Sequence, residues 1–104
     1  MVESPTNPMM RVCNLRALAD VTHSHEGILL SVDNTLMSPL LMKPLDHGAD
    51  FCVTSCTKFA VGHSDTMAGC VSVRDPELAK QVYFYQNAEG TGLAPFDCWL
   101  LLRG

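Results

Sequence analysis

The sequence predicts an α/β domain built on a mixed, mostly parallel sheet with flanking helices. Short runs that are apolar on both faces alternate with segments of helical periodicity, and turn residues mark the junctions. Runs of this kind are typical of buried parallel strands, because helices cover both sides of such a sheet. The chain has 104 residues, 47% of them apolar and 17% charged. This composition can fill a core, so wholesale disorder is not expected.

The first half of the chain predicts two strands with a helix between them. Residues 1–2 read as the end of a strand, and residues 4–8 form a loop rich in proline and cap-type residues. From about Met9, apolar residues recur every three to four positions, which predicts a helix that ends at Gly27. The apolar run 28–32 predicts a second, buried strand.

The next segment predicts a short helix and two more strands. Residues 40–46 could form the helix, which Gly48 would end. Apolar runs at 51–54 and 67–73 predict the strands. Because the link at 59–66 is too short for a parallel crossover, we expect these two strands to be antiparallel neighbours.

Two helices close the chain. Asp75, Pro76 and Glu77 combine a capping side chain, a proline in the first turn and an acid near the positive helix end. This helix ends at residues 89–92, and a last helix covers residues 95–103. Both ends of the chain read as interrupted elements, so we expect a piece of a larger domain.

Charge and cysteine usage exclude several function classes. Seven Lys and Arg stand against 11 Asp and Glu, which gives a net charge of −4. With no basic stripe, nucleic acid is not an expected partner. No apolar run approaches the length of a membrane span. The five cysteines contain no Cys-x-x-Cys pair, so neither a disulfide framework nor a metal site is predicted.

Polar side chains cluster where three predicted strands end, at residues 4–7, 33–35 and 55–58. In open α/β sheets, ligands bind beyond the carboxyl ends of the strands. We therefore expect an amide, an acid, two hydroxyls and an amine to meet at one rim of the sheet. These candidates are Asn7, Asp33, Ser55, Thr57 and Lys58.

This set of groups fits a pyridoxal phosphate site. A lysine Schiff base with an acid on the pyridinium nitrogen is the recurring architecture for that cofactor. Hydroxyls at Ser55 and Thr57 could hold the phosphate while Lys58 reaches the far end of the same ligand. Taken alone, Lys58 is more typical of a surface salt bridge, and Asp33 before Asn34 is more typical of a helix cap or turn former.

Three motifs resemble the cysteine/methionine-metabolism family of pyridoxal-phosphate enzymes, in that family's order. They lie at residues 3–8 (ESPTNP), 32–35 (VDNT) and 50–59 (DFCVTSCTKF), the last followed by residues 62–65 (GHSD). The closing stretch at 86–99 is most similar to the plant-type beta-lyase branch of the family. The resemblance implies that residues 1–104 are the central part of the large cofactor-binding domain of a fold-type I enzyme, truncated at both ends.

The resemblance also implies a role for each candidate. Lys58 would form the Schiff base and later move protons, and Asp33 would pair with the pyridinium nitrogen. Ser55 and Thr57 would bind the phosphate, and Asn7 would approach the phenolic oxygen of the cofactor. Within the same signature, Cys56 stands where the family commonly has a smaller alanine.

The activity implied is α,β-elimination of cystathionine to homocysteine, pyruvate and ammonia in methionine biosynthesis. The substrate would be a small sulfur amino acid, and the full-length enzyme a homodimer or homotetramer in the cytoplasm or plastid stroma. This piece alone is expected to be inactive, because the family's substrate-binding arginine follows it. Gamma-synthase and gamma-lyase activity in the same family remain alternatives.

A distant alternative is a receiver-like module in which Asp33 is phosphorylated and Lys58 contacts the phosphate. Such modules need neighbouring acids to hold Mg²⁺. Here Asn34 follows Asp33 and no acidic pair precedes it, which disfavours this alternative.

Overall fold

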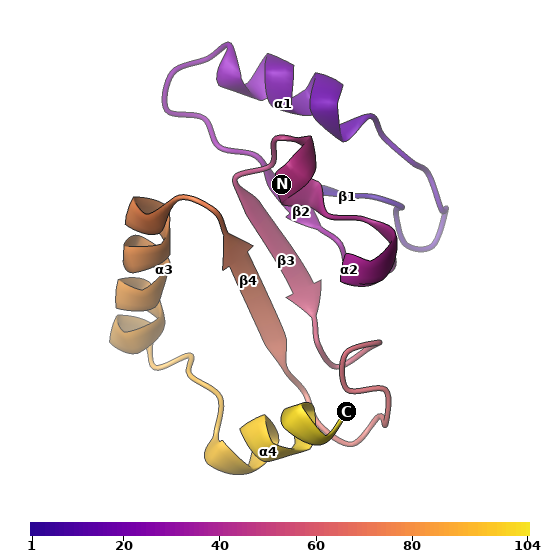
Figure 1. Cartoon of the computed structure of the whole chain (residues 1–104), viewed down its shortest axis with the longest axis vertical. Helices are drawn as coiled ribbons and strands as arrows, with labels where there is room; N and C mark the ends of the chain where they lie inside the picture. The colour runs from indigo at the N-terminus through magenta and orange to yellow at the C-terminus, as the bar shows by residue number, and fades with distance from the viewer.

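The computed structural model describes residues 1–104 and contains one four-stranded sheet in the order β1-β2-β3-β4 (Figure 1). Strands β1 (Val2–Glu3), β2 (Ser31–Asp33) and β3 (Phe51–Ser55) are parallel. Strand β4 (Gly69–Val73) is antiparallel to β3. The predicted mixed, mostly parallel sheet is confirmed, including the reversal after the short link between the last two strands.

Helix α1 (Leu15–His23) begins later than the sequence predicts. Its N-cap is Asn14, whose side chain accepts a hydrogen bond from the Ala17 amide at 3.1 Å. The expected start at about Met9 is wrong, because the preceding residues close a loop instead. The Thr6 amide donates to the Arg11 carbonyl at 2.9 Å, which holds the loop shut before the helix can begin.

The expected boundaries at the other end of α1 are also wrong. The helix ends at His23 and is capped by Ser24, whose amide donates to the Asp20 carbonyl at 3.1 Å, so it stops before Gly27. Strand β2 is shorter than the predicted run at 28–32. The Leu30 amide donates to the side chain of Asp50 at 2.6 Å, so a side chain takes the place of a strand partner there.

The short helix predicted at 40–46 is divided into two pieces, α2 (Ser38–Leu41) and a 3-10 helix, η1 (Pro44–His47). Met42 separates them with an extended backbone. Gly48 ends η1 as predicted, with φ of 93°. A Cβ at this position would lie 2.8 Å from the Cβ of Ala19, so glycine also allows η1 to approach α1.

Helices α3 (Pro76–Glu89) and α4 (Pro95–Arg103) match the prediction. Asp75 caps α3 by accepting from the Glu77 amide at 2.8 Å, and Gly90 ends it with φ of 68°. Helix α3 lies beside β4, and α4 crosses beyond the opposite end of that strand (Figure 1). No helix of the chain has the length and apolar content needed to cross a membrane.

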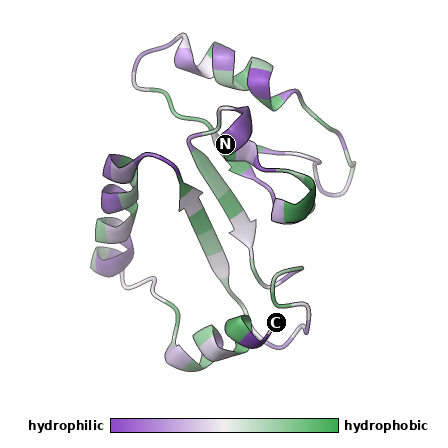
Figure 2. Cartoon of the chain, in the orientation of Figure 1, coloured by the Kyte–Doolittle hydropathy of each residue, from purple (hydrophilic) through white to green (hydrophobic).

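The core lies between α1 and the parallel strands. It consists of five buried apolar residues: Leu15, Ala19, Leu30, Val32 and Ala49. Strands β3 and β4 are largely hydrophobic over their length, whereas α1 and α3 carry mixed surfaces (Figure 2). Helix α3 has no buried residue, whereas Val61 and Leu100 of the second half of the chain are buried outside this core.

Candidate functional site

The three parallel strands end at one edge of the sheet, where an open hollow of about 1000 Å³ lies. The register places Glu3 beside Asp33 and Asp33 beside Val53, so the strands finish nearly level. Fifteen residues line the hollow. All of the predicted site residues are among them: Asn7, Asp33, Ser55, Thr57 and Lys58.

Asp33 ends β2 with a half-buried carboxylate. One carboxylate oxygen, Oδ1, accepts a hydrogen bond from the Thr35 amide at 2.9 Å. The other oxygen makes no hydrogen bond within the chain. Asp33 therefore forms a turn and also lines the hollow.

The Ser55 hydroxyl, on the last residue of β3, and the Thr57 hydroxyl, in the turn after it, differ in their hydrogen bonds. The Ser55 hydroxyl makes no hydrogen bond within the chain. The Thr57 hydroxyl donates to the Ala68 carbonyl at 3.2 Å and accepts from the Ala68 amide at 2.9 Å. Thr57 thus ties the segment after β3 to the segment before β4, and its only hydroxyl proton is already used.

Lys58 follows β3 in a turn that starts from the last residue of the strand. Its amide donates to the Ser55 carbonyl at 3.2 Å, and its carbonyl accepts from the Gly62 amide at 2.9 Å. The side chain is exposed, and its ammonium group forms no salt bridge within the chain. The backbone of Lys58 is therefore fixed while its amine stays free to react or bind.

Carboxylates dominate the charge around Lys58. Glu3, Asp33, Asp65 and Asp97 line the same hollow, and Lys58 is the one basic side chain among its lining residues. Each of these acids has a partner within the chain: Glu3 accepts from the Asn7 amide, and Asp33 accepts from the Thr35 amide. Asp65 pairs with Arg103 at 2.7 Å, and Asp97 accepts a hydrogen bond from the Thr66 hydroxyl at 2.7 Å. An anionic group entering the hollow would therefore depend on hydroxyl and amide donors as well as on Lys58.

Asn7 lies on the loop after β1. Its amide donates to the carboxylate of Glu3 at 3.1 Å, which holds the loop against the end of the strand. The side-chain amide of Asn7 has no partner within the chain and lies at the exposed rim of the hollow.

Sequence reasoning missed two kinds of lining residue. Thr35 lies inside the predicted 33–35 cluster, but no spacing signal showed that its side chain meets Ser55. Asp97 comes from α4, and it reaches the site through a contact with Thr66, 31 residues away in sequence. A single sequence carries no signal for such a long-range contact.

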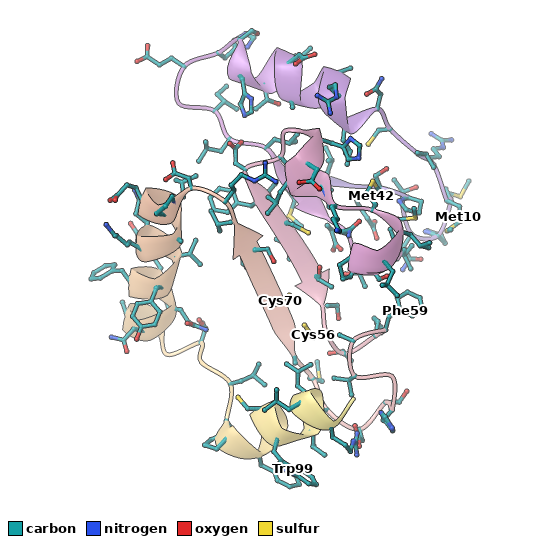
Figure 3. All side chains as sticks on the ribbon, in the orientation of Figure 1. Met10, Met42, Cys56, Phe59, Cys70 and Trp99 are labelled. Atoms are coloured by element: carbon teal, nitrogen blue, oxygen red, sulfur yellow. The ribbon has the colours of Figure 1, made fainter.

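A cluster of thiols lies on the opposite face of β3, because alternate strand residues point to opposite sides. Cys52, Cys56 and Cys70 line a separate cavity of about 290 Å³. Figure 3 shows Cys56, directly after β3, close to Cys70 on β4. Burial raises the pKa of Cys52, and burial together with the neighbouring Cys70 raises the pKa of Cys56 to about 11. Cys52 and Cys56 are therefore protonated near neutral pH, and none of the three thiols lines the hollow.

Comparison with known proteins identifies the family. Residues 1–104 match the family described as Cys/Met metabolism PLP-dependent enzyme. The chain belongs to this family. It is 54% identical over 103 residues to the chloroplastic cystathionine beta-lyase of Arabidopsis thaliana, covering 99% of this chain and 22% of the relative. It is 45% identical over 103 residues to the cystathionine gamma-lyase of Rattus norvegicus, covering 99% of this chain and 26% of the relative.

Solved structures agree with this family assignment. The crystal structure of cystathionine gamma synthase from Xanthomonas oryzae pv. oryzae in complex with aminoacrylate and cysteine superposes with a TM-score of 0.94 at 45% identity. The superposition covers 98% of this chain and 26% of that one. The predicted family and fold class are confirmed, and so is pyridoxal phosphate as the cofactor of the family. The chain spans about a quarter of the length of its relatives. Family membership decides against the receiver-like module.

Proposed function

We propose that this chain carries the cofactor-binding centre of a pyridoxal-phosphate-dependent carbon–sulfur lyase that converts cystathionine to homocysteine, pyruvate and ammonia. The observation that carries the proposal is the meeting of five predicted groups around one hollow. We propose residues 1–104 as the central part of the large domain of that enzyme. Proteins that share this sequence over a quarter of their length act on small sulfur amino acids by name, which supports the substrate class.

The donor set of the hollow fits pyridoxal phosphate. Lys58 offers an amine with no salt bridge, Ser55 offers a hydroxyl with no partner, and Asp33 offers one carboxylate oxygen with no hydrogen bond within the chain. These are the groups needed for an aldehyde, a phosphate and a pyridine nitrogen, respectively. The volume of about 1000 Å³ leaves room for a substrate as well.

The residues of the chain have distinct roles in this proposal. When bound, pyridoxal phosphate supplies an electron sink for the electron pair left when the substrate Cα–H bond breaks. The Lys58 amine would hold the cofactor in the resting protein and, when free, would accept the substrate Cα proton at Nζ. Asp33 would accept a hydrogen bond from the ring N–H and would keep that nitrogen protonated.

The phosphate would be held by hydroxyl donors at the end of β3. Ser55 can donate its free hydroxyl proton directly. Thr57 can donate to the phosphate only by turning its hydroxyl proton away from the Ala68 carbonyl, which it contacts at 3.2 Å. Asn7, on the loop after β1, would donate its side-chain amide to the phenolic oxygen of the cofactor.

The same anchor would also serve a cystathionine gamma-synthase or gamma-lyase. The higher identity to the Arabidopsis thaliana beta-lyase than to the rat gamma-lyase favours β-elimination. The names of two plant relatives include "chloroplastic", which supports the plastid stroma over the cytoplasm. We propose a homodimer or homotetramer for the full-length enzyme.

Borohydride reduction tests the lysine assignment. The full-length protein is purified, loaded with pyridoxal phosphate and reduced with borohydride. Its peptides are then mapped. The label is expected on Lys58, and Lys58→Ala is expected to lose it together with roughly a hundredfold or more of the elimination rate. Lys43→Ala and Lys80→Ala serve as matched controls that keep the label. A label on either of those lysines contradicts the proposal.

Product analysis separates the alternatives within the family. Elimination at Cβ of cystathionine releases pyruvate and homocysteine, whereas elimination at Cγ releases 2-oxobutyrate and cysteine. We expect pyruvate to dominate. If 2-oxobutyrate dominates, the proposed cofactor site would stand, but the proposed β-elimination would be wrong.

A further inference from the structure

Thr35 connects two residues of the proposed site by hydrogen bonds in opposite directions. Its amide donates to Asp33 Oδ1 at 2.9 Å, and its hydroxyl oxygen accepts from the Ser55 amide at 2.8 Å. Thr35 itself is half-buried and lines the hollow. The end of β2 and the end of β3 are therefore joined through one residue.

The side chain of Thr35 replaces a missing backbone partner. The last backbone hydrogen bond between these strand ends runs from the Asn34 amide to the Val53 carbonyl at 2.9 Å. The Asn34 carbonyl then turns away to accept from the amides of Met37 at 3.2 Å and Ser38 at 3.0 Å. The hydroxyl oxygen of Thr35 takes the place of the Asn34 carbonyl and accepts the hydrogen bond of the Ser55 amide.

We propose that Thr35 is a positioning residue that couples the Asp33 carboxylate to the Ser55 hydroxyl. It fixes the spacing between the group that binds the ring nitrogen and the group that binds the phosphate of one rigid cofactor. This inference rests on the proposed function, because Asp33 and Ser55 have a common ligand only there. Displacement of either group by a fraction of an ångström would weaken a pair of contacts that must be made together.

The chemistry of threonine suits this role. Its hydroxyl supplies the acceptor, and its β-branching restricts χ1 so that the acceptor stays aimed at the Ser55 amide. Serine keeps the acceptor but is less restricted. Valine has nearly the same shape with no acceptor, so it leaves the Ser55 amide unpaired in a half-buried place.

The test measures cofactor affinity in the protein at its native length. Thr35→Val is expected to raise the dissociation constant for pyridoxal phosphate roughly tenfold, the effect of one lost hydrogen bond. It is also expected to shift the pH midpoint of the absorbance band of the lysine-bound cofactor. Thr35→Ser is expected to restore both values to within about twofold of the wild type.

Thr54→Val is the matched control, because Thr54 precedes Ser55 and faces the thiol cavity. A Thr35→Val protein whose dissociation constant and pH midpoint match those of Thr54→Val would overturn the inference. If Thr35→Val fails to fold, the same measurements on Thr35→Ala decide, since alanine also removes the acceptor. Failure of the proposed function looks different, because the wild-type protein would then carry no borohydride label on Lys58.

Discussion

Cys56 lies two residues before Lys58, yet its side chain belongs to the other face of the sheet. It is 5% exposed, and burial together with Cys70 raises its pKa to about 11 from an ordinary value of 9.0. Two residues that are close in sequence thus lie in opposite environments. The Lys58 amine is accessible, whereas the Cys56 thiol is buried and protonated. The turn after β3 is the cause, because residues i and i+2 of a continuing strand would share one face; here the Lys58 amide donates back to the Ser55 carbonyl at 3.2 Å.

The raised pKa of Cys56 makes the stability of the fold fall at alkaline pH. The unfolded thiol loses its proton near pH 9, whereas the folded one keeps it until about pH 11. Between these values the unfolded state binds fewer protons, so the free energy of unfolding decreases as pH rises. We expect wild type to lose about 2 kcal/mol more than Cys56→Ala across this window in urea titrations. Equal losses in the two proteins would contradict the assignment.

Site residues differ in how far sequence could predict them. Asp33, Ser55 and Lys58 were predictable because polar residues directly after parallel strands meet at one edge. The separate states of the Ser55 and Thr57 hydroxyls were not predictable. They depend on where the Ala68 backbone lies, which is set by the antiparallel return of the chain.

Among the elements, those with strong local signals were predicted best. Helix α3 has a capping Asp75 and a terminal Gly90, and both ends match the structure. Helix α1 shows the opposite case. Its start was displaced because the hydrogen bond between Thr6 and Arg11 closes a loop that no periodicity reveals. Local sequence signals predict the ends of a helix or strand only where no contact from outside that element competes with them.

The packing of η1 against α1 gives a prediction at the scale of elements. Gly48 has φ of 93°, and a Cβ there would meet the Cβ of Ala19 at 2.8 Å. Gly48→Ala therefore adds a steric clash to the strain of a left-handed backbone. We expect it to lower the free energy of unfolding by roughly 3 kcal/mol, measured by urea denaturation.

Gly27→Ala is the matched control for this substitution. Gly27 has φ of 75°, but nothing lies within 4 Å of its added Cβ. Only the backbone strain applies, so we expect a loss of about 1 kcal/mol. If the two variants were equally destabilised, close packing of η1 on α1 would not be what requires glycine at position 48.

At the scale of the whole molecule, the chain exposes more surface than its mass predicts. A compact protein of this size has an accessible surface of about 5800 Å² and a radius of gyration of about 13 Å. The values here are 7269 Å² and 14.6 Å. Much of the excess is apolar: Leu40, Met67 and Leu102 are more than four-fifths exposed, and Trp99 projects from α4 (Figure 3). These surfaces support the proposal that the chain packs inside a larger domain and a larger assembly.

The isolated 104-residue chain is accordingly expected to behave as an incomplete fold. Its exposed apolar side chains would find each other or a hydrophobic dye, because only 14 of its residues are buried. We expect concentration-dependent self-association in sedimentation, strong binding of an apolar fluorescent dye, and no pyruvate release from cystathionine. The same measurements on the protein at its native length provide the comparison and should show the reverse of all three. A monodisperse isolated chain with robust lyase activity would mean that the hollow needs nothing beyond these residues. In that case the hydroxyl and amide donors of this chain alone would have to offset the negative charge of the carboxylates around Lys58 when an anionic group binds.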